Sequence, residues 1–338
     1  MESTTGAASL ASHLQSLAPS DGSRKDLFHS ILPAVVDAIG DIATALGKAH
    51  HVALAGTSNT FGDDQLNVDV EAENILRKAF ATKCPALVTA SSEEDPVEKD
   101  VHAPSETDGA EGGSAKELYT VAFDPLDGSS IIAPNWTVGT ILGVWEGTTA
   151  VGQSSDKQIA SVLGVYGPRT AAVIAIRIPG SKPSCFEVGL RDHGSEDCEI
   201  IRADVKLANA PFKTRYFAPA NLRAAGQDPR YMALVSRYIT DGYTLRYSGG
   251  LVPDVLHALV KGHGIYISPV TAKSKAKLRR LFELFPIALI VECVGGLAVD
   301  PTDGKRILDR VLEGTDERAG LVCGTAEEVE TVKEALIG

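Results

Sequence analysis

The stretch FDPLDGSSII, residues 123–132, places two acids, Asp124 and Asp127, on either side of a proline bend. Carboxylates held close together repel each other and resist ionising unless cations compensate their charge. Hard divalent cations such as Mg²⁺ do this with oxygen ligands and retain positions for phosphate oxygens. The carbonyl group of Leu126 lies between the two acids and offers one more oxygen. The bend therefore predicts a metal site, and a simple turn capped by aspartate is the alternative for this string alone.

The residues that follow the bend suit an anion. Gly128 permits close approach to the backbone, and Ser129 and Ser130 offer N–H and hydroxyl donors. A phosphate group beside the metal is the expected occupant.

Other acids in the chain are candidates for the same site. Glu93 and Glu94 are adjacent at the end of an apolar stretch, and Glu283 lies in the apolar string RLFELFP. A third group, near the start of a helix, contains Asp63, Asp64 and Asp69. A carboxylate in apolar surroundings needs a partner or a metal. Surface, capping or exposed-helix positions are the alternatives for each group taken alone.

Cations occur where an anionic substrate needs them. Arg246 stands beside Tyr247 and a glycine pair, which suits a phosphate against a close backbone, and TAKSKAKLRR is densely basic. A solvated basic face is the alternative for that cluster. Lys277 and Glu283 are six residues apart and do not share a helix face at about 100° per residue. Lys277 must therefore precede the helix if both reach one site.

Composition limits the classes of partner. The chain has 338 residues, a net charge of −12 and a pI of about 5.2, which disfavours nucleic acid and anionic membrane surfaces. No stretch approaches the roughly 18 apolar residues of a membrane span. Five cysteines without a CxxC pair indicate neither a disulfide framework nor a cysteine zinc site, so a reduced cytoplasmic location is expected.

The positioning elements are predicted to be mixed α and β, in two lobes. Apolar residues at helical spacing predict helices from Leu27 to about residue 46 and from Val68 to Phe80, the second with Asp69 in its first turn. Strand or short-helix material follows in LYTVAFDPLDG, TVGTILGVWEG, IASVLGVYG and TAAVIAIRI. We expect a flexible leader at 1–25, a first lobe at 26–205 with an exposed insertion at 96–116, and a second lobe at 206–338.

Taken together, these residues resemble the fructose-1,6-bisphosphatase and sedoheptulose-1,7-bisphosphatase family of the magnesium-dependent, lithium-sensitive phosphatase superfamily. The resemblance runs from about Leu27 to Glu330, and its strongest strings are GDDQLNVDV, SSEED, FDPLDGSS, VGTILGVW, YGPRT, LRYSGGLVPDV, AKLRRLFE and ECVGG. It implies the sugar phosphatase fold, a layered α-β-α-β-α sandwich of two lobes. DPLDGSSII, YGPRT and SPVTAKSKAKLR are more similar to the sedoheptulose branch.

The resemblance also implies roles for individual residues. The implied metal is Mg²⁺ or Mn²⁺. Its implied ligands are Glu93, Glu94, Asp124, the Leu126 carbonyl, Asp127 and Glu283. Asp63 and Asp69 help to order the attacking water with Glu93. Gly128, Ser129 and Ser130 bind the phosphate. The sugar bisphosphate is held by Asn221, Arg246, Tyr247, Lys277 and Arg279. The equivalent arginine of fructose enzymes crosses a subunit contact, which implies a homo-oligomer, a dimer or a tetramer.

Some positions depart from the family pattern. Ala133 replaces an acid that usually follows the motif, and Ser268 stands where fructose enzymes have a substrate-side tyrosine. The regulatory cysteine pair of the plant enzymes and the loop that binds a nucleotide inhibitor have no match. We expect Mg²⁺-dependent hydrolysis of the 1-phosphate of sedoheptulose 1,7-bisphosphate, by direct water attack. A fructose-1,6-bisphosphatase, a dual-specificity enzyme, an inositol-phosphate or nucleotide-phosphate hydrolase and an inactive sugar-phosphate sensor are the alternatives.

Overall fold

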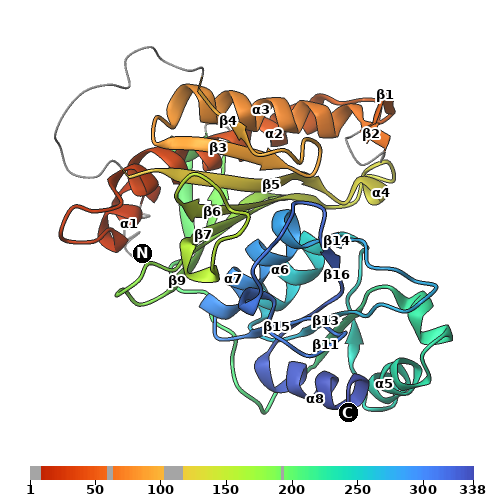
Figure 1. The fold of residues 1–338 in the computed structure, drawn as a ribbon. Coiled ribbons are helices and arrows are strands. Elements are labelled where there is room, and N and C mark those ends of the chain that lie inside the picture. The colour runs from red at the N-terminus through yellow and green to blue at the C-terminus, as the bar shows by residue number, and fades with distance from the viewer. Residues whose placement is uncertain (1–8, 59–63, 103–116, 192–193) are drawn as a thin grey trace, which may run out of the picture.

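The computed structural model describes residues 9–58, 64–102, 117–191 and 194–338, and helices and sheets alternate in five layers through it (Figure 1). The layered mixed α/β fold predicted from the sequence is confirmed. One core lies between the outer helices and the first sheet, a second between the two sheets, and a third beneath the last pair of helices. Asp63 lies outside the described residues.

The first sheet has eight strands in the order β10-β9-β8-β7-β6-β5-β3-β4. Its strands are β3 (Leu87–Ser92), β4 (Lys99–Asp100), β5 (Tyr119–Asp127), β6 (Val138–Glu146), β7 (Gln158–Tyr166), β8 (Thr170–Ile176), β9 (Ser184–Leu190) and β10 (Cys198–Arg202). Only the β3–β5 pair among them is parallel, with Ser92 opposite Phe123. The central strands are buried on both faces, which explains their continuous apolar sequences.

Helices α1 (Leu10–Leu17), α2 (Leu32–Lys48) and α3 (Asn67–Lys83), with the π-helical turn η1 (Leu27–Ile31), cover the outer face of this sheet. Residues 1–25 are predicted to be a flexible leader, but α1 is folded within this range. Leu10 and Leu14 are each 1% exposed, and Ser9 caps the helix by accepting a hydrogen bond from Ser12 N–H. These two leucines, one helical turn apart, anchor α1 to the core. Two apolar positions are too few to reveal a helical period in the sequence.

The segment Leu27–Lys48 has 22 residues and contains an 18-residue window with a mean hydropathy of 1.4, so by length and composition alone it could cross a membrane. The expectation that the sequence holds no such stretch is therefore wrong by composition. The fold accounts for the apolar residues differently. Leu32, Val35 and Ile39 are fully buried between α3 and the sheet, as in the core helix of a globular domain.

The middle layer consists of α6 (Leu251–Lys261), the π-helical turn η5 (Arg280–Leu284) and α7 (Phe285–Cys293), between the two sheets. Helix α7 is apolar on all sides because sheets lie on both sides of it. The second sheet has the order β12-β11-β13-β17-β15. Its strands are β11 (Tyr216–Pro219), β12 (Thr244–Leu245), β13 (Ile265–Ser268), β15 (Leu297–Val299) and β17 (Leu321–Gly324). Helices α5 (Pro229–Thr240) and α8 (Ala326–Leu336) cover its outer face.

Short elements complete the chain. Two antiparallel ribbons pair β1 (Leu54–Ser58) with β2 (Asp64–Leu66), and β14 (Leu278–Arg279) with β16 (Arg318–Ala319). Short helical turns are α4 (Ser129–Ile132), η2 (Ser155–Lys157), η3 (Gly194–Asp197), η4 (Leu222–Gly226) and η6 (Ile307–Asp309). The chain passes from the first sheet to the second between Arg202 and Tyr216. Part of the insertion expected at 96–116 is ordered, because β4 pairs with β3 and Glu98 accepts a hydrogen bond from Ala150 N–H.

Candidate active site

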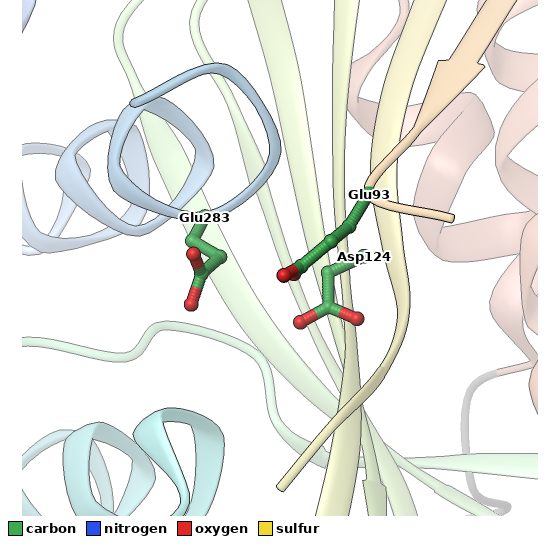
Figure 2. Close-up of side chains that lie close together, drawn as sticks. All are labelled: Glu93, Asp124 and Glu283. Atoms are coloured by element: carbon green, nitrogen blue, oxygen red, sulfur yellow. The ribbon is translucent and has the colours of Figure 1, made fainter. Parts of the chain in front are cut away.

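Three carboxylates from distant parts of the chain meet at the edge of the first sheet. Glu93 follows β3, Asp124 lies in β5 and Glu283 lies in η5, and one oxygen from each is within 4.8 Å of the others. Figure 2 shows the three side chains directed into the space between η5 and the two strands. The convergence predicted from the sequence is present.

The parallel pairing of β3 and β5 explains why two of these acids are neighbours. Parallel strands end at the same edge of a sheet, and Glu93 N–H donates to the Phe123 carbonyl over 3.0 Å. The proline bend expected after Asp124 is not found, because β5 continues to Asp127 with an irregular register against β6. Leu126 N–H donates to Asp124 Oδ1 over 3.0 Å. This aspartate-to-backbone contact, which the string DPLD also allows, therefore coexists with the acid cluster.

Asp127 has a second structural partner. Its Oδ1 accepts Leu251 N–H over 3.1 Å and its Oδ2 accepts Val252 N–H over 2.7 Å, so the carboxylate caps the first turn of α6. Unpaired N–H groups at a helix start favour a negative charge there. Each carboxylate oxygen has two acceptor positions, so both oxygens can still coordinate a cation.

Glu94 and Asp69 complete the acidic wall. Gln65 Nε2 donates to Glu94 Oε2 over 2.5 Å, and Leu66 N–H donates to Asp69 Oδ2 over 3.1 Å. The second contact belongs to a capping arrangement at the start of α3. Asp69 Oδ1 is buried without a partner among the described residues. A buried acceptor of this kind suits an ordered water or a cation.

The cluster resists ionisation in the absence of a cation. Burial raises the pKa of Asp124 and of Glu283 well above the ordinary range, and the neighbouring charge of Glu93 raises both further. Burial also raises the pKa of Asp127 to about 7, against the lowering effect of the Val252 and Leu251 N–H groups. It raises the pKa of Glu94 to about 7 and of Asp69 to about 6. Bound cations would remove this cost, so the oxygen donor set fits hard divalent metals.

A cavity of about 200 Å³ unites the predicted metal and phosphate residues. It is lined by Asp69, Glu93, Glu94, Asp124, Leu126, Asp127, Gly128, Ser129, Ser130, Gly249, Lys277, Leu278 and Glu283. Gly128 has a φ of 101°, a conformation that favours glycine, and turns the chain from β5 into α4. Lys277 reaches the cavity from a position before η5, as its spacing from Glu283 requires.

Comparison of the chain with known proteins shows the family to which it belongs. Residues 14–188 match the model "Fructose-1-6-bisphosphatase, N-terminal domain", and residues 210–337 match the corresponding C-terminal domain. The chain belongs to the fructose-1,6-bisphosphatase family. It is 39% identical to the chloroplastic sedoheptulose-1,7-bisphosphatase of Triticum aestivum, over 86% of this chain and 69% of the relative.

Two further relatives extend the comparison. The class 1 fructose-1,6-bisphosphatase of Syntrophotalea carbinolica is 34% identical, over 94% of this chain and 91% of the relative. A crystal structure from Toxoplasma gondii that carries a provisional sedoheptulose-1,7 bisphosphatase name is 34% identical. It superposes with a TM-score of 0.82 over 98% of each chain.

The side chain of Arg279 does not reach the cavity in which a substrate contact was predicted. Its side chain is 0% exposed and does not line the cavity. Arg279 Nε donates to Glu93 Oε1 over 3.1 Å, Nη1 pairs with Asp316, and the backbone N–H donates to Glu283 Oε2 over 2.5 Å. The residue that the resemblance implies for sugar binding therefore contacts two predicted metal ligands instead.

Of the other predicted sugar residues, Lys277 lines the acidic cavity, whereas Asn221, Arg246 and Tyr247 lie apart from the acids. Arg246 and Tyr247 line a second, larger cavity of about 680 Å³, which also includes Trp136 and Asp254. Asn221 lines neither cavity, because its amide donates to the Pro269 carbonyl over 2.6 Å and accepts from Ser274 Oγ over 2.5 Å. The structure therefore groups the predicted sugar residues incompletely.

One relevant residue was not predicted from the sequence: Asp316 pairs with Arg279, yet it lies in an ordinary charged loop. Gly249, which belongs to the glycine pair that the sequence suggests for phosphate, lines the smaller cavity. Asp254 could have been predicted, because in LRYSGGLVPD it is an acid in the first turn of a helix, a position typical of a structural role. Of the two departures from the family pattern, Ala133 follows α4 directly and Ser268 ends β13, partly exposed.

Proposed function

We propose that the protein hydrolyses the 1-phosphate of sedoheptulose 1,7-bisphosphate, giving sedoheptulose 7-phosphate and phosphate. The observation that carries this proposal is the convergence of Glu93, Asp124 and Glu283 within 4.8 Å. The phosphate-type segment Gly128–Ser130 lies on the wall of the same cavity. The relative from Triticum aestivum bears the corresponding name, and it is 39% identical to this chain.

The residues present fit Mg²⁺, with Mn²⁺ as a second choice. Glu93, Glu94, Asp124, the Leu126 carbonyl, Asp127 and Glu283 provide only oxygen donors. Asp69, whose Oδ1 has no partner among the described residues, lines the same cavity. When bound, such cations polarise the phosphoryl group, lower the pKa of a water and stabilise the leaving oxygen. No phosphorylated intermediate is needed for water attack.

The side chains then have separate tasks. Glu93, aided by Asp69, orients the attacking water and takes its proton. Gly128, Ser129 and Ser130 hold the 1-phosphate with N–H and hydroxyl donors, and Lys277 adds a positive charge at the cavity wall. Arg279 holds Glu93 rather than the sugar.

The larger cavity supports a site for the rest of the sugar. Arg246 there lies over the Tyr216 ring at 5.8 Å and keeps an exposed guanidinium for a distal phosphate. Leu245 and Trp136 nearby are 54% and 53% exposed, which supports a subunit contact over this face. A homo-oligomer, dimer or tetramer, is thus part of the proposal. A reduced cytoplasmic setting agrees with five cysteines that are all free.

Fructose 1,6-bisphosphate is the second candidate substrate, because several relatives at 34% identity are named fructose-1,6-bisphosphatase. The test is phosphate release from both sugars with Mg²⁺ present or chelated, and the ratio of kcat/KM decides between them. A higher kcat/KM for the fructose ester overturns the sedoheptulose assignment. Calorimetric binding of both sugars without phosphate release would instead indicate a sensor.

A further inference from the structure

The segment Arg246–Gly249 takes part in both cavities. Arg246, Tyr247 and Ser248 line the cavity of about 680 Å³, while Gly249 lines the cavity of about 200 Å³ that contains the acids. A substrate with phosphates at both ends must extend past this segment. Its conformation therefore determines how the two cavities join.

The segment is shaped by a left-handed residue that packs closely. Gly249 has a φ of 105°, and a Cβ built there would lie 3.3 Å from Ile131 Cγ2 in α4. A Cβ at Gly250 would lie 3.1 Å from Ile131 Cδ1 and 3.0 Å from Pro253 Cγ. The segment thus rests on the same short helix that begins with Ser129 and Ser130, so a displacement of it disturbs the phosphate wall.

One buried acid holds this segment in place. Asp254 is 7% exposed, and its Oδ1 accepts Ser248 N–H over 2.7 Å and Ser248 Oγ–H over 2.8 Å. Its Oδ2 accepts Gly249 N–H over 3.2 Å. Three donors converge on one carboxylate, and two of them are the backbone groups of residues that line different cavities. Ser248 Oγ in turn accepts Gly250 N–H over 3.3 Å.

We propose that Asp254 is a positioning residue for the bisphosphate substrate, which it serves by fixing Ser248 and Gly249 at the junction of the two cavities. The substrate class rests on the proposed function, whereas the fixing of the segment rests on the three hydrogen bonds alone. Asp254 does not line the acidic cavity, although its charge is near enough to raise the pKa of Asp127. Its effect is therefore expected mainly on substrate binding, with a smaller effect on metal binding.

The test variant is Asp254→Asn. Whichever way the amide turns, one backbone N–H of Ser248 or Gly249 then faces another donor, while the side-chain volume is unchanged. We expect KM for the preferred sugar bisphosphate to rise about tenfold, with kcat and half-saturation by Mg²⁺ each changed less than about threefold. Ser248→Ala removes the hydroxyl contacts with Asp254 and with Gly250 N–H, keeps the backbone donors of Ser248 and Gly249, and is expected to raise KM about twofold to threefold.

Amide hydrogen exchange provides a readout that does not depend on turnover. Exchange across 246–250 is expected to accelerate in Asp254→Asn, while exchange in α7 stays as in the wild type. Asp228→Ala is the matched control for a loss of stability alone, since Asp228 caps α5 by accepting Arg230 N–H over 2.9 Å and lines neither cavity. It is expected to lower Tm and leave KM as it is.

Two results overturn the inference. One is unchanged exchange across 246–250 in Asp254→Asn. The other is a fall in kcat and in Mg²⁺ affinity with KM unchanged, which would place Asp254 on the metal side. If wild-type protein hydrolyses neither sugar bisphosphate, the proposed function fails, and the exchange measurement still decides whether Asp254 fixes the segment.

Discussion

The substitution Asp69→Asn is expected to stabilise the metal-free protein in a pH-dependent way. Asp69 is 4% exposed, and burial raises its pKa from 3.8 to about 6. The folded state therefore keeps a proton that the unfolded chain has already lost between these two values. Because the folded state binds more protons, its stability falls as pH rises through this window, and the full penalty is present above about pH 7.

The size of the penalty follows from the two pKa values. A difference of about two pKa units corresponds to roughly 3 kcal/mol above pH 7, at about 1.4 kcal/mol per unit. At pH 4.5 only about 1 kcal/mol of it is present. Asparagine cannot ionise, and its side-chain oxygen can still accept Leu66 N–H and cap α3. The variant should therefore gain on the order of 5 °C in Tm at pH 7.5 and much less at pH 4.5.

The assay is calorimetric unfolding of wild type and Asp69→Asn from pH 4.5 to 7.5, each in a chelator and in saturating Mg²⁺. Bound Mg²⁺ compensates the acids, so the difference in Tm between the two proteins should shrink when the metal is present. Phosphate release should fall in the same variant, since Asp69 is assigned to the water. A difference in Tm that is independent of pH, or that grows in Mg²⁺, would refute the reasoning.

Three more predictions concern other parts of the molecule. Glu283→Gln should lower kcat by at least about a thousandfold, because a predicted metal ligand is lost. It should still raise the Tm of the metal-free protein, because burial raises the pKa of Glu283 well above the ordinary range and keeping this acid buried has a free-energy cost that glutamine lacks. Phosphate release and calorimetry measure the two effects, and a lower metal-free Tm would contradict the electrostatic account. Asp316→Asn should weaken Mg²⁺ binding about twofold to fivefold in a calorimetric titration, because the Arg279 guanidinium then interacts more strongly with Glu93 and competes with the metal. Glu330→Gln on α8 is the control, and equal Mg²⁺ affinities of Asp316→Asn and the wild type would exclude the effect. Leu14→Ala should lower the free energy of unfolding by about 2–4 kcal/mol in denaturant titrations with kcat unchanged, because Leu14 is 1% exposed. A change near zero would instead support the prediction that residues 1–25 are a flexible leader.

Periodicity predicted the parts of the fold where one face is buried. The helix predicted from Leu27 to about residue 46 corresponds to η1 and α2, and the stripe from Val68 to Phe80 lies within α3. Helix α1 was missed because its eight residues follow a polar, low-complexity start, and only Leu10 and Leu14 are buried. The docking of α1 on the first sheet depends on partners far along the chain, which local patterns do not contain.

The acid cluster could be predicted because its chemistry needs several carboxylates and the resemblance supplied their order. Geometry inside the cluster could not. Arg279 precedes the turn that carries Glu283, so its sequence position is compatible with either a cavity-facing or an inward side chain. The antiparallel pairing of β14 with β16 decides the matter, because it brings Asp316 to the Arg279 guanidinium. That pairing joins residues about 40 positions apart and leaves no local pattern.

Asp127 shows why a metal ligand can have more than one structural task. Asp127 accepts two backbone N–H groups of α6, and α6 is preceded by the segment that lines both cavities. One carboxylate thus joins the acid cluster to the element that faces the sugar. Its removal takes away a ligand and a helix cap together, so loss of activity in such a variant would not isolate the metal contribution. Among the described residues, Glu283 accepts one backbone hydrogen bond, from Arg279 N–H, and glutamine can keep that bond. The metal site is therefore better tested at Glu283, where charge can be removed while the local hydrogen bond remains.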